Sequence, residues 1–273
     1  MNDTVLRITY SPIEATFLAS LLGADMLLGI QDPFLGWLTE EIEDAWNQAR
    51  SALAERHFIE EQPDGSIVMD TAAAALIGTW AFPEASFLVT FTPLDDSPQI
   101  CSFHLTRNLA VEQAQVSDAI QLTALEDAQA VYWRILEMMR LKEKDLLAAP
   151  VPGVKLSESH LRAARARAVE VGEKGALEAL REAGLPENTA QSLASTLAKP
   201  VANSALTALA RRSTTWEASG LGLLEGTNGL WLLRSFARDR ENWVELVPCD
   251  AVQARQEVRQ VMNRVLPEPL VGE

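Results

Sequence analysis

The predicted secondary structure elements repeat along this 273-residue chain. Four short segments of alternating or apolar residues, at 87–91, 100–105, 109–113 and 120–124, precede a predicted helix from Glu126 to about Leu147. A second series has strands at about 203–212, 216–224, 230–237 and 243–247 and a helix from Asp250 to Leu266. The Asn-Gly pair at 228–229 is a strong hairpin signal. Each half is therefore predicted to end in four strands and a helix.

Residue matches between the halves support an internal duplication. Residues 120–129 align with residues 244–253 at an offset of 124. The apolar positions of the two helices match at an offset of 123: Ala128, Val131, Ile135 and Met138 in the first, and Ala251, Ala254, Val258 and Val261 in the second. The predicted class is α+β, with two pseudo-symmetric halves that each contain helices, a four-stranded antiparallel sheet and a C-terminal helix. The stripe on the last helix is expected to pack on its own sheet, and a dimer contact is the alternative.

The other predicted elements are helices and one extra hairpin in the first half. Ser11 and Glu14 form a capping box around Pro12, and Thr39 starts an amphipathic helix that reaches Leu53. A hairpin is predicted at 58–69, and Asp70 starts an alanine-rich helix. In the second half, Ser157 starts a helix that runs toward Leu180.

Charge divides the chain at the same place as the repeat. Residues 1–150 hold 8 Lys and Arg against 23 Asp and Glu, so they carry the whole net charge of −15, whereas residues 151–273 hold 15 of each. Residues 148–155 are the predicted linker, because their two prolines and one glycine cannot continue a helix. We therefore expect an acidic half at 1–149 and a neutral half at 150–273. If a partner is steered electrostatically, residues 1–150 should carry the salt dependence.

Composition excludes several classes of protein. A hydrophobic fraction of 48% excludes a disordered chain. The longest apolar run, 17–30, is broken by Gly23, Asp25 and Gly29, so no membrane span is predicted, and the N-terminus lacks the features of a signal peptide. Two cysteines suit a reducing cytoplasm, the predicted location. The acidity argues against nucleic-acid binding. The helix–hairpin–helix stretch at 39–82 could form a DNA-binding winged helix, but its hairpin is acidic and would repel the phosphates.

No catalytic, cofactor or metal site is predicted. The three histidines, His57, His104 and His160, are not grouped with Cys or carboxylates at metal-ligand spacing. Cys101 alternates with apolar residues and is expected to be buried and inert, which leaves Cys249, before a predicted helix, as the reactive-thiol candidate. The glycines at 220–226 lie in and after a strand, so they do not indicate a phosphate loop.

Two tryptophans on the late strands are candidate partner-binding residues. Trp231 and Trp243 alternate with Leu232 and Leu246, which predicts that at least one sheet face carries aromatic rings that need covering. A partner protein, a second copy of the chain or the other half of the chain could provide the cover.

The order of elements resembles the EspG family of type VII (ESX) secretion. The resemblance rests on Leu21-Leu-Gly23, the helix end at 54–59 with the turn at 64–67, Trp80-Ala-Phe-Pro83, and the hairpin at 229–233 followed by 242–248 and the last helix. It implies a cytosolic chaperone of pseudo-twofold α+β fold that binds a helical secretion substrate. It also implicates the loop between the early strands, here short and acidic, so Asp95 and Asp96 join the candidate residues. An Arg-Gly-Arg-Tyr-like run of the family is replaced here by Gly229-Leu-Trp-Leu.

The sequence therefore predicts a non-enzymatic chaperone or adaptor for a helical protein, with a homodimer as a further possibility. The alternative is a small-molecule-binding protein or enzyme with a pocket between the halves, for which a deep cleft with converging titratable groups would be the sign. A nucleic-acid-binding regulator ranks third.

Overall fold

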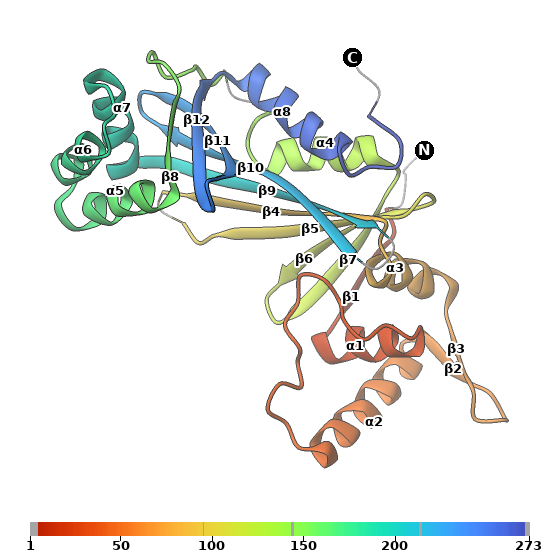
Figure 1. Ribbon diagram of the computed structural model, residues 1–273. Coiled ribbons are helices and arrows are strands. Elements are labelled where there is room, and N and C mark those ends of the chain that lie inside the picture. Colours follow the sequence, from red (N-terminus) through yellow and green to blue (C-terminus); the bar gives the residue numbers. More distant parts are fainter. Residues whose placement is uncertain (1–4, 95, 143–144, 213–214, 271–273) are drawn as a thin grey trace.

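The computed structural model describes residues 5–94, 96–142, 145–212 and 215–270. The chain forms eight helices, one large antiparallel sheet and one small hairpin in that described part (Figure 1). The first half contains β1 (Arg7–Tyr10), α1 (Pro12–Leu21), α2 (Thr39–Glu55), β2 (Ile59–Glu61), β3 (Ile67–Met69), α3 (Thr71–Ala81), β4 (Ala85–Pro93), β5 (Gln99–Leu105), β6 (Ala110–Val116), β7 (Ala119–Leu125) and α4 (Ala128–Met138). The second half contains β8 (Val154–Ser157), α5 (Glu158–Val171), α6 (Glu173–Glu182), α7 (Glu187–Ala198), β9 (Pro200–Arg212), β10 (Thr215–Gly226), β11 (Gly229–Arg238), β12 (Glu241–Cys249) and α8 (Ala251–Asn263).

All strands except β2 and β3 join one ten-stranded sheet in the order β1-β7-β6-β5-β4-β9-β10-β11-β12-β8. The halves meet where β4 pairs antiparallel with β9, for example Val89 with Leu206. The expected pair of separate four-stranded sheets is therefore one continuous sheet. An unpaired strand edge exposes a row of backbone donors and acceptors, and the β4–β9 pairing removes two such edges. The short strands β1 and β8, which the sequence did not predict, form the outer edges.

One face of the sheet is covered by α4 and α8, which lie side by side (Figure 1). The largest core cluster fills this layer and draws residues from both halves, such as Phe87 and Leu206. Arg259 of α8 stacks over the Tyr132 ring of α4, with 5.0 Å between the guanidinium carbon and the ring centroid. The apolar stripe of α8 is buried against this core, as expected from the sequence: Ala251, Ala254, Val258 and Val261.

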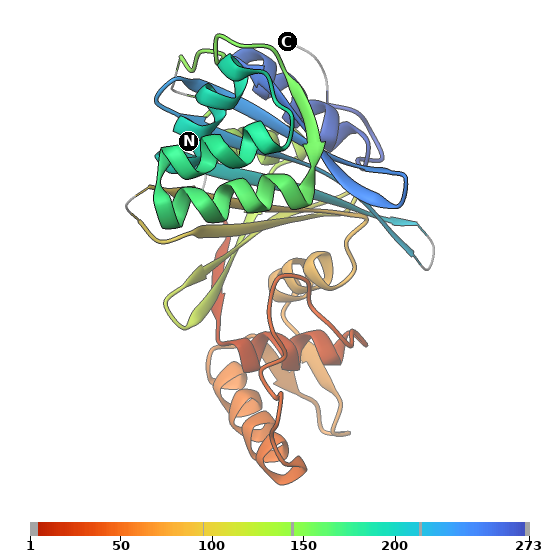
Figure 2. The ribbon, with the colours of Figure 1, turned by 60° about the vertical axis from the view of Figure 1, so that its left-hand side comes forward.

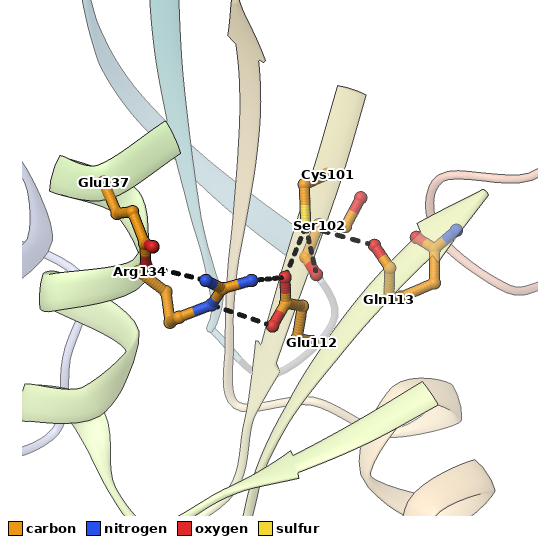
Figure 3. Close-up of polar contacts among 6 residues, drawn as sticks. All are labelled: Cys101, Ser102, Glu112, Gln113, Arg134 and Glu137. Carbon is orange, nitrogen blue, oxygen red and sulfur yellow. Dashed lines mark hydrogen bonds and ion pairs between the residues drawn. The ribbon is translucent and has the colours of Figure 1, made fainter. Parts of the chain in front are cut away.

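An ion-pair cluster fixes α4 to the first half of the sheet (Figure 3). Arg134 donates to both carboxylate oxygens of Glu112 on β6, at 2.8 and 3.1 Å, and to Glu137 at 2.7 Å. These hydrogen bonds raise the pKa of Arg134 above its usual value. Cys101 lies against Glu112, with 3.6 Å from Sγ to Oε1, and burial raises its thiol pKa, as expected for an inert cysteine.

The opposite face of the sheet carries two separate helical layers. Helices α1 and α3 cover strands of the first half. In the second half α5 packs on β8 and β12 and α7 packs on β9 and β10, so each layer has a core cluster of its own (Figures 1 and 2). The N-caps predicted at Ser11, Asp70 and Ser157 are confirmed, because each side chain accepts a hydrogen bond from a backbone N–H of the first turn.

Three helix predictions need correction. Helix α4 ends at Met138 rather than about Leu147, because Arg140 takes a positive φ of 54° and Leu141 N–H donates back to the Leu136 carbonyl. The helix expected from Ser157 toward Leu180 is two helices, broken at Gly172 with a φ of 81°. The sequence also did not predict α7, which packs on the central strands β9 and β10.

Candidate functional site

The central sheet opens in its second half. Strands β10 and β11 pair only from Gly222–Leu233 to the turn at Gly226–Gly229. Beyond that point β10 follows β9 and β11 follows β12, as Figure 1 shows, so the two strands diverge. The result is a cleft of about 950 Å³ between them.

The floor of the cleft consists of small side chains. Ala205 and Thr207 of β9 and Ala218, Gly220 and Gly222 of β10 line it. At Gly220 a Cβ atom would lie 2.7 Å from the Leu206 carbonyl oxygen, so the close approach of β10 to β9 requires glycine there. This explains the glycine run as a packing feature rather than a phosphate loop.

The walls of the cleft come from both faces of the sheet. Glu158 and Leu161 of α5 line one side, and Glu257 of α8 and Arg264, directly after α8, line the other. Lys155 of β8 also lines the cleft. Arg264 Nη1 lies 3.3 Å from Ser219 Oγ on β10. The cleft therefore passes through the plane of the sheet, because its lining residues belong to both faces.

A charge network of strands β8, β12 and β11 and helix α8 lines the cleft. Glu245 Oε1 lies 3.1 Å from Lys155 Nζ, and its Oε2 lies 3.5 Å from Arg234 Nη1. Arg234 also reaches Glu257, with 2.5 Å from Nη2 to Oε1. The hydrogen bond from Lys155, and then that from Arg234, holds the pKa of Glu245 below its usual value. Both signs of charge are thus fixed in the cleft, and Glu245 stays ionised at neutral pH.

The structure separates the predicted partner-binding residues. Trp231 is fully buried in the core beneath α5–α7, so the other elements of its own half cover it and it is not available to a partner. Trp243 pairs with Phe236, a cleft residue, and therefore lies on the same face of the sheet as Phe236. Trp231 is an odd number of positions from Phe236 on β11, so it lies on the opposite face. Trp243 carries Arg238 over its ring at 5.2 Å. Of these two tryptophans, only Trp243 lies beside the cleft.

The acidic turn between β4 and β5 lies beside the helical layer of the second half. Leu94 N–H donates to the carbonyl of Val201 at the start of β9, the strand that comes after α7. Asp96 accepts a hydrogen bond from the N–H of Ser97, at 2.7 Å. Asp95 lies outside the described residues.

The sequence reading missed the charged cleft residues. Arg234 and Glu245 each interrupt an apolar strand segment, and that interruption is the signal that could have found them. Lys155 is the last residue of the predicted linker, but in the structure it belongs to β8, which pairs with β12. Nothing in the sequence predicts that Glu257 faces Arg234.

The structure changes the assignment of Cys249. Its side chain is buried at the junction of β12 and α8, and burial together with the carboxylates of Asp250 and Glu257 raises its pKa to about 12. Burial and these carboxylates disfavour the thiolate form of Cys249. His57, His104 and His160 lie apart, and the described residues contain no group of His, Cys, Asp and Glu suited to a metal ion.

Comparison with known proteins assigns the fold. The model of the EspG family matches residues 11–260, and no curated protein sequence matches the chain. A solved structure of the Mycobacterium tuberculosis type VII secretion system chaperone EspG5, in complex with a PE25-PPE41 dimer, is similar over 97% of this chain and 99% of that chain, with a TM-score of 0.65 and 16% identity. Among the described residues no helix combines the length and hydrophobicity that a bilayer crossing needs. Because the family model spans most of its length, the chain belongs to the EspG family.

Proposed function

We propose that this protein is a non-enzymatic chaperone of the type VII secretion pathway that binds a helical protein partner in the cytoplasm. Its membership of the EspG family supports the proposal, and the cleft between β10 and β11 is the observation that carries it to particular residues. The solved EspG5 chaperone is in complex with a PE25-PPE41 dimer, so a paired helical substrate is the partner that this likeness suggests.

The shape of the cleft suits a protein segment. Small side chains on β9 and β10 let a partner approach the sheet closely, and α5 and α8 form walls on either side. The walls carry fixed charges of both signs. These charges would contribute mainly to specificity for a partner with a complementary charge pattern, and less to binding affinity. Trp243, beside Phe236 at the rim, and Asp96, on the turn next to α7, extend the proposed docking surface.

The alternative of an enzyme with a pocket between the halves has less support. The large cleft lies within the second half, between β10 and β11, rather than at the β4–β9 junction. Its carboxylates are ion-paired, and the lowered pKa of Glu245 suits charge recognition rather than proton donation at neutral pH.

We also infer that the two halves are pseudo-symmetric copies. The strand order places β1, β7, β6, β5 and β4 in one half opposite β8, β12, β11, β10 and β9 in the other. This correspondence supports the division into 1–149 and 150–273. A homodimer through the α8 stripe is not part of the proposal, because that stripe is buried within the chain.

Co-purification with each small helical protein encoded near its gene, followed by mass spectrometry, tests the function. Ala218→Arg places a long cation in the cleft from an exposed position, and we expect it to reduce recovery of the partner at least about tenfold. Ala237→Arg is the matched control, because Ala237 is exposed on the neighbouring strand and does not line the cleft. A wild-type chain that captures none of the candidates, or equal losses in both variants, would contradict the proposal.

A further inference from the structure

A second groove lies on the helical layer of the first half. It has a volume of about 730 Å³ and runs between the start of α1, one face of α2 and the turn at Gly36 and Trp37. In both views α2 lies at the opposite end of the molecule from α5–α7 (Figures 1 and 2). The groove is therefore separate from the cleft between β10 and β11.

The base of this groove is a row of alanines. Ala45, Ala49 and Ala52 are spaced four and three residues apart on α2, which places them on one face of the helix. Ile13 of α1 forms an apolar wall beside them. Small residues at this spacing let the backbone of another helix approach closely. A helix that binds in such a groove contacts it through side chains three and four residues apart on its own surface.

An aromatic side chain is held in position at the rim. Trp37 packs edge-to-face on Phe34, with ring centroids 5.8 Å apart, and Phe34 lies 6.1 Å from Trp46. Trp46 in turn packs against the buried Phe17 at 5.7 Å. This chain of rings anchors Trp37 to the core although 43% of its surface remains exposed. A fixed, partly exposed tryptophan is a typical anchor at a protein interface.

The charge around the groove is almost entirely negative. Residues 11–70 contain twelve Asp and Glu, two Arg and no Lys. Both arginines already bind carboxylates of the same layer: Arg50 pairs with Glu61, and Arg56 donates to both oxygens of the buried Glu14 at 3.0 and 3.1 Å. The exposed rim of the groove carries Glu41 and Asp44. A ligand that approaches this surface therefore meets net negative charge.

We propose that this groove binds a basic amphipathic α-helix of another protein. The alanine row and Ile13 would contact its apolar stripe, Trp37 would pack against the edge of that stripe, and the rim carboxylates Glu41 and Asp44 would attract its Lys or Arg side chains. Nucleic acids and anionic lipid surfaces share the sign of this surface and are repelled. This binding does not rest on the chaperone function proposed above, because it uses different residues at the other end of the molecule.

A synthetic peptide of about 18 residues made of Lys, Ala and Leu in a helical pattern is the probe, since shorter isolated helices are marginal in water. A fluorescent label on the peptide reports binding by anisotropy. We expect the wild-type chain to bind it with an affinity that falls as salt is added, and to bind a peptide with Glu in place of Lys at least about tenfold more weakly.

Two pairs of variants separate the charge of the groove from its shape. Asp44→Arg reverses a rim charge, and Glu43→Arg makes the same change on an exposed neighbour of α2 that does not line the groove. Ala52→Phe fills the groove, and Ser51→Phe places the same ring on an exposed position outside it. We expect each groove variant to weaken peptide binding roughly five- to tenfold and each control to weaken it less than about twofold.

Several results would overturn the proposal: no binding to the wild-type chain, equal binding of the acidic peptide, or equal losses in the groove and control variants. Light scattering provides a further check. Concentration-dependent self-association that Asp44→Arg abolishes would show that a second copy of the chain fills the groove instead. Ala218→Arg in the cleft should leave peptide binding unchanged, so failure of the proposed chaperone function and failure of this groove are distinguishable.

Discussion

Arg234 on β11 and Glu257 on α8 form an ion pair beside the opening of the sheet, with 2.5 Å between Nη2 and Oε1. Arg234 also contacts Glu245 on the neighbouring strand β12, and Glu245 in turn pairs with Lys155 on β8. The pairs thus connect three adjacent strands to the helix that covers them. Because β10 and β11 share few backbone hydrogen bonds, these side chains help to fix the walls of the cleft.

Removal of the Glu257 charge should destabilise the protein. The Glu257 side chain is only 17% exposed. Glu257→Gln replaces its carboxylate with a neutral amide, so the partly buried Arg234 guanidinium loses one of its ion pairs. We expect a loss of about 1–2 kcal/mol in the free energy of unfolding, measured by urea titration. Asp239→Asn removes a carboxylate from an exposed pair with Arg238 and should cost less than about 0.5 kcal/mol. Equal effects would show that the buried pair has no special role.

Substitution of glycine in β10 should depend on position. Gly220→Ala places Cβ 2.7 Å from the Leu206 carbonyl oxygen, so β9 or β10 must shift. We expect it to lower the unfolding free energy by about 1–3 kcal/mol. Gly222→Ala is the control in the same strand, because its nearest neighbour, Leu233 Cβ, is 3.4 Å away, and it should be nearly neutral. Calorimetric melting of both variants measures the difference.

Stability should fall as the solution becomes mildly acidic because of His104. This side chain is fully buried on β5, with Ser86 Oγ 3.0 Å from Nδ1, and burial lowers its pKa to about 3. The unfolded chain binds a proton at His104 near its ordinary value of 6.5, whereas the folded chain does not. The stability is therefore present above pH 6.5 and is lost progressively as the pH falls toward 3, with a maximum slope of about 1.4 kcal/mol per pH unit.

The variant His104→Gln should reduce that slope between pH 6.5 and 5. Chemical denaturation at several pH values in this range measures it. The lowered pKa of Glu245 adds its own loss of stability only as the pH falls below the ordinary glutamate value of 4.5, so the two effects can be separated. A wild-type slope that persists in the variant would assign the pH dependence to another group.

Both cysteines should resist modification in the native protein. Burial is the main cause that raises the pKa of Cys101 and of Cys249, the latter to about 12, so the reactive thiolate is scarce at pH 8. An aromatic disulfide reagent should react with neither thiol in the folded chain and with both in denaturant. Rapid reaction of one thiol in the folded protein would restore Cys249 as a reactive group.

Local patterns predicted the strands and helix starts well. The alternation of Phe87, Val89 and Phe91 placed β4, and the Asn-Gly turn placed the β10–β11 hairpin, because period-two burial and turn geometry depend on neighbouring residues. The sequence did not predict β1 and β8. These strands have four residues each and exist because they pair with β7 and β12, which lie far away in the chain.

The candidate sites were less predictable. Trp231 and Trp243 are chemically alike in the sequence, yet one is enclosed by helices of its own half and the other lies beside the cleft. The cleft depends on where β10 leaves β11, and the groove depends on how α2 packs beside α1. Each is a relation between distant segments, which residue type and spacing do not encode locally.

The sequence alone determined the repeated order of strands and helices, the segregation of negative charge into the first half and the helix caps, since each depends on composition or on residues a few positions apart. Only the tertiary structure decided that the two halves share one sheet through β4 and β9, that the sheet opens between β10 and β11, and which side chains face the opening. The physical reason is that unpaired strand edges and apolar faces can each pair or pack with several other segments of the chain. Which of these pairings forms is decided only when the whole chain has packed.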